Sequence, residues 1–387
     1  LIISTVNNCD SAIERNIIVD SINADFTVIN PVRCADDLNV NFNNLSGTHF
    51  GIANYTWTFG DNSTSSLQNP PTHVYPGYGN YNVMLALNSV HGCTDTFRIV
   101  PAVVINPLPS ATIVGDSIHC TPGTYQYTAN VNSIDAIQTY QWTINGVATG
   151  TNSATLNHLF NAGNYTIGLV VATINSCDSS IQRNIIVDSI NADFTVINPV
   201  RCADDLNVNF TNNSGSHFGI ADYTWTFGDN TTSSVQNPPT HPYPGYGNYD
   251  VMLALNSVHG CTDTFQIVPA VVINPLPSAT IVGDSIHCTP GTYQYTANIN
   301  SIDAIQTYEW RVNGVAAGTN SATLNHLFTA GNYTIGLKVL TNNNCEDEIQ
   351  KIIIVDSVNA DFTVINPVRC ADDLNVNFNN LSGTHFG

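Results

Sequence analysis

Cysteine is the residue type whose spacing in this chain most clearly indicates chemistry. Regularly spaced cysteines in a repeat protein indicate disulfides formed in an oxidising compartment. One set has a constant spacing of 84: Cys9, Cys93, Cys177, Cys261 and Cys345. The other set alternates between spacings of 86 and 82: Cys34, Cys120, Cys202, Cys288 and Cys370. This register predicts one bond within each complete domain: Cys34–Cys93, Cys120–Cys177, Cys202–Cys261 and Cys288–Cys345.

Each predicted bond closes a long loop within its domain. For a loop of roughly 60 residues, the chain-entropy model gives a stabilisation of about 4 kcal/mol. Cys9 and Cys370 would pair with cysteines in parts of their domains that lie outside this sequence. The alternative is zinc, with ligands at His119-Cys120 and His91-Gly92-Cys93, but the chain has no CxxC knuckle. The spacing favours disulfides.

Two aspartates in Gly-Asp-Asn turns, Asp61 and Asp229, are the candidate metal ligands. Calcium takes hard oxygen ligands such as these carboxylates. The same residues are typical of an Asx turn that closes a hairpin, and we favour that interpretation. A second acidic locus, typical of a solvated turn, follows three of the cysteines: Asp36-Asp37, Asp204-Asp205 and Asp372-Asp373. We expect no cofactor, and calcium at these aspartates is the alternative.

No arrangement of the plentiful serines, histidines and aspartates indicates catalysis. The chain has no Gly-x-Ser-x-Gly elbow, His-Glu-x-x-His motif, phosphate loop or dinucleotide fingerprint. We therefore expect no enzymatic activity.

The elements that position these residues repeat along the chain with a period of 168. Ser21–Asn106 returns as Ser189–Asn274 with nine differences, and Pro107–Asp188 returns as Pro275–Asp356. The cysteine register divides each period into an A-type and a B-type domain. The predicted order is residues 1–20, C-terminal strands of a preceding B domain; 21–106, A; 107–188, B; 189–274, A; 275–356, B; and 357–387, N-terminal strands of a following A domain. Repetition this close favours a spacer or a multivalent surface over an active site.

Two-residue alternation predicts β-strands throughout. Tyr55, Trp57 and Phe59 alternate with threonines, and Asn145-Gly146 is a strong hairpin signal because both turn residues accept a positive φ. About seven short strands, one central tryptophan and a cysteine pair in each domain predict an antiparallel β-sandwich with an internal disulfide. The tryptophans should lie in the core: Trp57, Trp142, Trp225 and Trp310. Proline-rich joints, such as Asn106-Pro107-Leu108-Pro109, should be semi-rigid.

The charge of the chain limits its partners. It has 29 acidic residues against nine basic ones, a net charge of −20, and only 10% charged residues. Binding to nucleic acid or to an anionic membrane rests on lysine and arginine, so both are excluded as partners. No stretch approaches the roughly 20 apolar residues of a membrane span, so direct membrane insertion is not expected.

The A domain carries a series of motifs around its central tryptophan: Tyr55-Thr-Trp57-Thr-Phe59-Gly60-Asp61-Asn62, Asn69-Pro70, His73, Tyr75 and Gly79-Asn-Tyr81-Asn-Val83. In these motifs it resembles the PKD domain family. The family has glycine where this chain has Asn62, and asparagine also tolerates a left-handed backbone. The B domain keeps Trp142, His158, Phe160 and Gly163-Asn-Tyr165, and looks like a divergent PKD or Ig-like relative.

Long arrays of such domains resemble giant surface proteins of gliding and predatory bacteria that use type IX secretion. That resemblance implies an extracellular, cell-surface location and a structural role in a fibre or adhesin. The alternatives are a carbohydrate-binding accessory array of a secreted hydrolase and a passive spacer for a terminal adhesin. The expected partners are other copies of the chain in a multi-chain filament, and surface glycans. Asp-Ser-apolar triplets resemble the O-glycosylation signal of this bacterial group and imply glycans at Ser21, Ser117, Ser189, Ser285 and Ser357.

Overall fold

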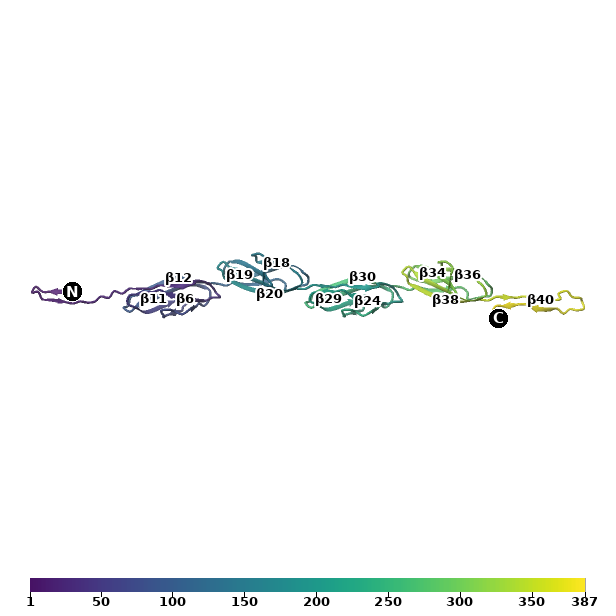
Figure 1. The fold of residues 1–387 in the computed structure, drawn as a ribbon, viewed down its shortest axis with the longest axis horizontal. Helices are drawn as coiled ribbons and strands as arrows, with labels where there is room; N and C mark the ends of the chain where they lie inside the picture. The colour runs from purple at the N-terminus through teal and green to yellow at the C-terminus, as the bar shows by residue number, and fades with distance from the viewer. Residues whose placement is uncertain (387) are drawn as a thin grey trace. The chain divides into compact units, whose positions relative to one another are not determined.

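The computed structural model describes residues 1–386, which form β-strands and turns without a helix (Figure 1). It follows that this part of the chain has no helix that is long and apolar enough to cross a membrane. The chain divides into two compact units, Leu1–Asp188 and Ser189–Gly387. Each unit contains two consecutive β-sandwiches, one of A type and one of B type. The predicted all-β array of Ig-like and PKD-like sandwiches is confirmed.

The A sandwich of unit 1 places a three-stranded sheet, in the order β10-β6-β4, against a five-stranded sheet, in the order β5-β12-β11-β8-β9. A further short pair joins β3 to β7. The strands are β3 (Ile22–Asn23), β4 (Phe26–Ile29), β5 (Val32–Cys34), β6 (Asn39–Asn44), β7 (Gly47–Thr48), β8 (Ile52–Thr58), β9 (Thr64–Ser65), β10 (His73–Val74), β11 (Gly79–Ser89) and β12 (Thr94–Asn106). All pairs are antiparallel except β5 with β12, which is parallel.

The B sandwich of unit 1 has the same plan, with sheets β13-β15-β18 and β14-β20-β19-β16-β17. Asn145 and Gly146 form the turn between β16 and β17 with φ of 50° and 80°, as predicted for this hairpin. The strands are β13 (Ser110–Val114), β14 (Ile118–His119), β15 (Gly123–Asn132), β16 (Ile137–Ile144), β17 (Val147–Thr149), β18 (Thr155–Phe160), β19 (Gly163–Thr173) and β20 (Asp178–Val187).

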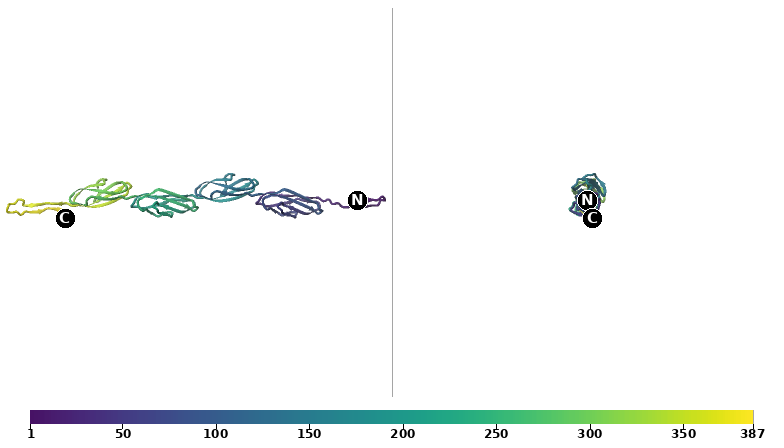
Figure 2. Two further views of the ribbon diagram at one scale, coloured as in Figure 1. Left: turned by 180° about the vertical axis from the view of Figure 1, so that it is seen from behind. Right: turned by 90° about the vertical axis from the view of Figure 1, so that its left-hand side faces the viewer.

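Unit 2 repeats both sandwiches. Its A strands are β21 (Ile190–Asn191), β22 (Phe194–Ile197), β23 (Val200–Cys202), β24 (Asn207–Asn212), β25 (Gly215–Ser216), β26 (Ile220–Thr226), β27 (Thr232–Ser233), β28 (His241–Pro242), β29 (Gly247–Ser257) and β30 (Thr262–Asn274). Its B strands are β31 (Ser278–Val282), β32 (Ile286–His287), β33 (Gly291–Asn300), β34 (Ile305–Val312), β35 (Val315–Ala317), β36 (Thr323–Phe328), β37 (Gly331–Thr341) and β38 (Glu346–Val355). Within each sandwich the strands run along its long axis (Figure 2).

A tryptophan lies at the centre of every sandwich, as the alternation predicts. Trp57 and Trp225 are fully buried, and Trp142 and Trp310 are 1% and 2% exposed. The indole Nε1 of Trp57 donates a hydrogen bond to the Leu67 carbonyl at 3.0 Å, which satisfies its polar atom inside the core. The tryptophans are therefore core residues.

The chain ends form small strand pairs outside the four sandwiches. These strands are β1 (Ile2–Ser4), β2 (Asp10–Ala12), β39 (Val358–Asn359), β40 (Phe362–Ile365), β41 (Asn377–Asn380) and β42 (Gly383–Thr384). Phe362 is 60% exposed, whereas Phe26 and Phe194, which occupy the same position of the repeat, are 1% exposed. The exposure arises because, within residues 1–386, no second sheet packs on the terminal strands.

Candidate functional site: the disulfide-bridged joint

The disulfides connect consecutive sandwiches, and the predicted pairing within sandwiches is wrong. Cys34 of the A sandwich bonds to Cys177 of the B sandwich, and Cys202 bonds to Cys345 in the same way. Each bond spans 143 residues, with Cα atoms 5.5 Å apart. Two further cysteines are also disulfide-bonded, Cys120 and Cys261. The exposed free thiols are Cys9, Cys93, Cys288 and Cys370.

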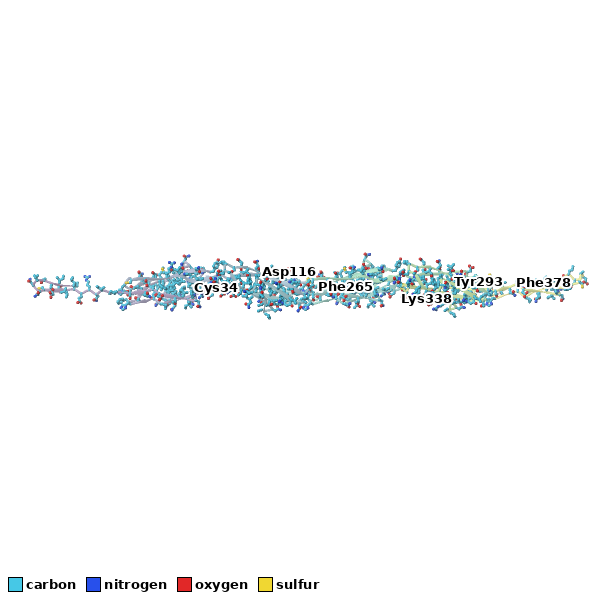
Figure 3. All side chains as sticks on the ribbon, turned by 90° about the horizontal axis from the view of Figure 1, so that it is seen from above. Cys34, Asp116, Phe265, Tyr293, Lys338 and Phe378 are labelled. Carbon is cyan, nitrogen blue, oxygen red and sulfur yellow. A yellow bond between two sulfur atoms is a disulfide. The ribbon has the colours of Figure 1, made fainter. Side chains whose placement is uncertain are left out.

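Bonds do not form within a sandwich because its two cysteines lie at opposite ends. Strand β12 begins at Thr94, next to Cys93, and ends at Asn106, which is the register partner of Cys34 in β5. Its 13 residues cover about 40 Å at ~3.3 Å per residue. A disulfide requires Cα atoms within about 7 Å. Figure 3 labels Cys34 at the end of its sandwich that faces the B sandwich.

The B sandwich separates its cysteines in the same way. Cys177 immediately precedes the ten-residue strand β20. Cys120 follows His119, whose parallel partner Val187 ends that strand. We call the end of a sandwich that carries Cys93 or Cys177 its upstream end, and the end that carries Cys34 or Cys120 its downstream end. The Cys34–Cys177 bridge therefore joins a downstream end to the upstream end of the next sandwich.

Arg33 holds the segment around Cys34 in place. Its guanidinium donates to the carbonyls of Ile29 at 3.1 Å, of Asn30 at 2.9 and 3.1 Å, and of Asn39, and forms an ion pair with Asp37 at 2.7 Å. The planar guanidinium, with five donors, suits this convergence of acceptors. Arg201 makes the corresponding contacts beside Cys202.

A tight hairpin turn presents Cys177 at the upstream end of the B sandwich. The Thr173 amide donates to the Cys177 carbonyl at 2.9 Å, and the Cys177 amide donates to Thr173 Oγ1 at 3.3 Å. Both residues are fully buried. Cys345 lies in an equivalent turn and is 1% exposed. The upstream sulfur of each bridge is therefore shielded from solvent, whereas Cys34 and Cys202 are half-buried.

A side-chain hydrogen bond crosses the same joint and is anchored on both sides. Asn175 Nδ2 donates to Asn106 Oδ1 at 3.3 Å and to Asp135 Oδ2 at 3.1 Å. Asn106 Nδ2 in turn donates to the Arg33 carbonyl at 3.5 Å. The peptide chain between the sandwiches is only the short proline-rich stretch 107–109. The sandwiches of one unit are thus held by two covalent connections, and two points of attachment restrict a hinge far more than one.

The upstream end of the A sandwich also holds the chain that precedes it. The Asp20 side chain is 1% exposed, and its Oδ2 lies 3.3 Å from His91 Nδ1. Hydrogen bonding to Ser89 and His91 holds the pKa of Asp20 below its ordinary value, although burial opposes the shift. This contact fixes the preceding segment two residues from Cys93.

The candidate calcium ligand Asp61 is occupied by hydrogen bonds. Its Oδ1 accepts from the Ser63 amide at 3.0 Å and from the Ser63 hydroxyl, and its Oδ2 lies 2.7 Å from His73 Nε2. Burial raises the pKa of Asp61, but these bonds outweigh it and hold the pKa below its ordinary value. Asp229 has the same environment. Residues 1–386 contain no group of three or more metal-binding side chains. The geometry favours the Asx turn, and calcium binding stays a prediction.

The same three side chains do not form a nucleophilic triad. In such a triad one histidine nitrogen bonds the acid and the other bonds the serine. Here Ser63 and Asp61 both contact His73 Nε2, at 3.3 and 2.7 Å, and Ser63 bonds the carboxylate directly. Thr231 replaces this serine in unit 2 with the same contacts. These hydrogen bonds hold the β8–β9 turn against β10.

The predicted glycosylation serines lie outside the strands, each directly before a two-residue strand near the start of its domain. Ser21, Ser117 and Ser285 are exposed, whereas Ser189 and Ser357 are half-buried. The Ser117 carbonyl accepts a hydrogen bond from the Ile186 amide at 2.8 Å. Its backbone is therefore ordered while its side chain faces solvent. Glycosylation stays a prediction for all five serines.

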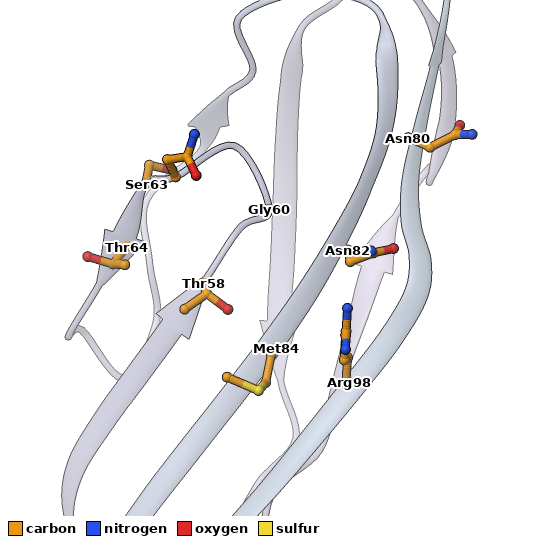
Figure 4. A pocket seen from close by; sticks show the side chains of 9 residues that line it. Thr58, Gly60, Ser63, Thr64, Asn80, Asn82, Met84 and Arg98 are labelled. Atoms are coloured by element: carbon orange, nitrogen blue, oxygen red, sulfur yellow. The ribbon is translucent and has the colours of Figure 1, made fainter.

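A shallow groove of about 460 Å³ lies on the A sandwich of unit 1 (Figure 4). Hydroxyl and amide groups dominate its lining, with Arg98 and Asn82 on one side and Thr58 and Thr64 on the other. Three of the nine differences between the A sandwiches fall on lining positions: Ser63/Thr231, Asn82/Asp250 and Arg98/Gln266. The substitutions replace a cation with a neutral amide and introduce an anion. The two A sandwiches thus present different charge at this place.

The sequence places Asn106 in the proline-rich joint, but it does not predict the contacts of Arg33 and Asn175 there, nor that of Asp20 at the upstream end of the A sandwich. One signal was available. The motif Asn-Pro-Val-Arg-Cys-Ala-Asp-Asp occurs three times in a chain with only nine basic residues, and it places arginine next to cysteine each time. No sequence pattern indicates that Cys34 and Cys93 are separated by the full length of a strand. That separation depends on which strand pairs in parallel with β12.

Comparison with known proteins supports the domain type. The PKD domain family matches residues 25–104 and 192–272, which are the two A sandwiches. No curated protein matches the chain. The chain therefore contains PKD-like domains in tandem with Ig-like ones.

A comparison with solved structures finds matches at low sequence identity and low TM-score. Fibronectin(III)-like modules of CbhA from Clostridium thermocellum are 18% identical over 43% of this chain and 95% of theirs, with a TM-score of 0.26. A Ca²⁺-stabilised adhesin with which an Antarctic bacterium binds ice is 12% identical over 85% and 98%, with a TM-score of 0.27. Three domains of the bacteriophage RB49 outer capsid protein Hoc are 13% identical over 64% and 98%, with a TM-score of 0.34. Scores this low carry no argument about fold or function.

Proposed function

We propose that this chain is a structural repeat region of an extracellular bacterial surface fibre or adhesin, used for adhesion, gliding or attachment to prey or surfaces. The observation that carries the proposal is the bond between consecutive sandwiches, Cys34–Cys177 and its repeat Cys202–Cys345. A bond between domains holds neighbours in a fixed relation, which a folding domain does not need but a fibre does. Disulfides of this kind also persist in an oxidising setting outside the cytoplasm.

The partners follow from the repetition. Copies of one chain that lie side by side in register meet the same surface at every A–B pair, so weak contacts are multiplied. With 10% charged residues, few side chains keep neighbouring sheets apart, although the net charge of −20 opposes close packing at low ionic strength. We therefore include a multi-chain filament, exported by a type IX pathway, in the proposal.

Electron microscopy of cells that produce the protein, with antibodies raised against the recombinant chain, tests this function. Labelling should follow filaments at the cell surface, and the filaments should bundle as salt screens the negative charge. Labelling confined to the cytoplasm would overturn the surface location. Threads one domain wide at every salt concentration would overturn the multi-chain filament alone.

The groove around Asn82 and Arg98 favours one second function, carbohydrate binding in an accessory array of a secreted hydrolase. Hydroxyl and amide groups at its lining are suited to sugar hydroxyls. A glycan array probed with the full chain tests it, with Asn82→Ala/Arg98→Ala as the matched variant. Binding that the double substitution abolishes would support this function. A chain that binds no glycan in the array would leave the structural role, or that of a passive spacer for a terminal adhesin.

A further inference from the structure

We propose a further function for the two bridges: they make each A–B pair inextensible under tension while oxidised, and extensible once reduced. This property concerns the mechanics of the folded chain, so it does not depend on the cellular location proposed above. It follows from where the bonds lie relative to the ends of each pair.

Because of the Cys34–Cys177 bond, a pulling force does not act on most residues of the pair. It closes a loop of 143 residues that contains every strand from β6 to β19. Tension on the pair passes from Ser21 to Cys34, across the sulfur atoms, and from Cys177 to Asp188. The loop stays slack because its ends are only 5.5 Å apart. Fully extended, the loop would span about 500 Å.

The first half of the load path, from Ser21 to Cys34, can lengthen only slightly under tension. The Ala24 amide donates to Asp95 Oδ2 at 2.7 Å near the start of β12, and Cys34 pairs with Asn106 at the end of β12. The segment 24–34 therefore runs along nearly the whole length of β12. It has about as many residues as the part of β12 that it follows, so it is itself nearly extended. Stretching it further adds little, since it already covers the length of the sandwich.

The second half of the load path is a single strand. Residues between Cys177 and Asp188 form β20, which makes an antiparallel ladder of ten register pairs with β19. A strand rises ~3.3 Å per residue, close to the ~3.6 Å maximum of any chain. Pulling on its two ends loads the whole ladder along the strand axis.

Unit 2 repeats this path. Its bond joins Cys202 and Cys345 over 143 residues, the Ala192 amide donates to Asp263 Oδ2 at 2.7 Å, and Cys202 pairs with Asn274. Each unit is therefore an inextensible link of the same construction.

Reduction converts the link to an extensible one. A dithiol such as dithiothreitol attacks the half-buried Cys34 sulfur as a thiolate and releases the Cys177 thiolate, which takes up a proton. The second thiol of the reagent then displaces Cys34. Two electrons pass to the pair, which becomes two thiols, and the reagent leaves as a cyclic disulfide. Force then acts on all residues of both sandwiches.

Single-molecule force spectroscopy on the full chain, held by ligation tags at its two ends, tests the proposal. The terminal segments lengthen early in either redox state. Beyond that, the oxidised chain should show no unfolding step up to rupture of the attachment. With dithiothreitol it should show steps of about 250 Å, one for each sandwich. Without reductant, the variant Cys34→Ser/Cys177→Ser should show such a step for the A sandwich of unit 1, whereas Cys120 of the B sandwich is still disulfide-bonded.

The matched control is Cys93→Ser/Cys288→Ser, which removes two free thiols and should behave as the unsubstituted chain. Unfolding steps of whole-sandwich length in the oxidised unsubstituted chain would overturn the proposal, as would equal traces with and without dithiothreitol. Circular dichroism of each variant before pulling identifies any variant that fails to fold. If a variant fails to fold, the comparison of the unsubstituted chain with and without dithiothreitol still tests the proposal.

Discussion

At the scale of single residues, the cysteines carry the most consequential chemistry, and their environment separates two roles. Cys177 and Cys345 are buried partners of a bond, whereas Cys93 and Cys288 are exposed thiols. Cys93 lies in the same kind of turn as Cys177, with its amide bonded to Ser89 Oγ at 3.1 Å. Local structure is thus alike for bonded and free cysteines, and the neighbouring sandwich makes the difference.

Alkylation of the folded, oxidised chain should modify Cys93 and Cys288 together with Cys9 and Cys370. Cys34, Cys177, Cys202 and Cys345 should react only after reduction, because they are bonded. Peptide mass spectrometry after two-colour labelling measures both groups. Protection of Cys93 and Cys288 before reduction would show that the bonds form within sandwiches.

Replacement of Asp61 by asparagine should destabilise the A sandwich in a pH-dependent way. The pKa of Asp61 is held below its ordinary value, so its contribution is present above the unfolded pKa of about 3.9 and is lost as the pH falls through the folded value. Asp61→Asn should cost about 1–2 kcal/mol at pH 7 and much less near pH 2. Hydrogen exchange over residues 55–75 measures this, with exposed Asp36→Asn as the control. An equal cost at both pH values would contradict the assignment.

At the scale of elements, β5 is short and depends on Arg33 and on its parallel pairing with β12. It has only three residues, yet it carries Cys34 to the joint. A three-residue strand has few ladder bonds of its own, so the guanidinium contacts to the flanking loops supply much of its order. The position of Cys34 in the bridge therefore depends on the contacts of Arg33.

Arg33→Lys should loosen β5, because lysine cannot supply the fork of donors that reaches several carbonyls. A loss of about 1.4 kcal/mol would raise local opening roughly tenfold. Hydrogen exchange over residues 29–39 and the rate at which dithiothreitol reduces Cys34–Cys177 should both rise by about that factor. The control is Arg98→Gln, which reproduces the residue of the second A sandwich, Gln266. Equal rates for the two variants would contradict the role of Arg33.

The β8–β9 turn depends on Gly60. Its φ is +87°, and an added Cβ would lie 2.5 Å from the Asn82 carbonyl oxygen. Gly60→Ala should therefore destabilise the A sandwich by about 2 kcal/mol through backbone strain and this clash. Gly77→Ala is the control, since a Cβ there meets nothing within 4 Å. Hydrogen exchange over residues 55–65 should rise in the first variant and stay unchanged in the second.

At the scale of the whole molecule, the bridges couple the folding of neighbouring sandwiches. Closing a loop of 143 residues removes unfolded-state entropy worth about 5 kcal/mol in the chain-entropy model. That is a large share of the roughly 5–15 kcal/mol typical of a domain. Two sandwiches so joined gain stability as a pair.

Reduction should therefore lower the melting temperature and separate the A and B transitions. Differential scanning calorimetry of the oxidised chain should show the sandwiches of one unit melting together, and calorimetry of the reduced chain should show two lower transitions. Oxidised Cys93→Ser/Cys288→Ser should melt as the unsubstituted chain does. Identical scans before and after reduction would show that the bridges do not stabilise the pair.

The repeat, the all-β class and the core can all be predicted from local sequence patterns. Period-two alternation and the central tryptophans are local patterns, and burial of Trp57 and its repeats follows directly from them. The Asn145-Gly146 hairpin was equally local, since its two turn residues set their own φ angles. The Asx turn at Asp61 was predicted for the same reason, because its bond to Ser63 spans two residues.

The pairing of the cysteines, in contrast, depends on how the strands pair and how consecutive sandwiches meet. Spacing along the chain places Cys34 and Cys93 in one domain, but β12 separates them by its whole length and parallel pairing sets Cys34 beside Asn106. Which thiols meet depends on the end of the sandwich each one occupies and on what the next sandwich presents there. A bond across a joint is a contact between distant residues in three dimensions, and a regular register in sequence fits either pairing equally well.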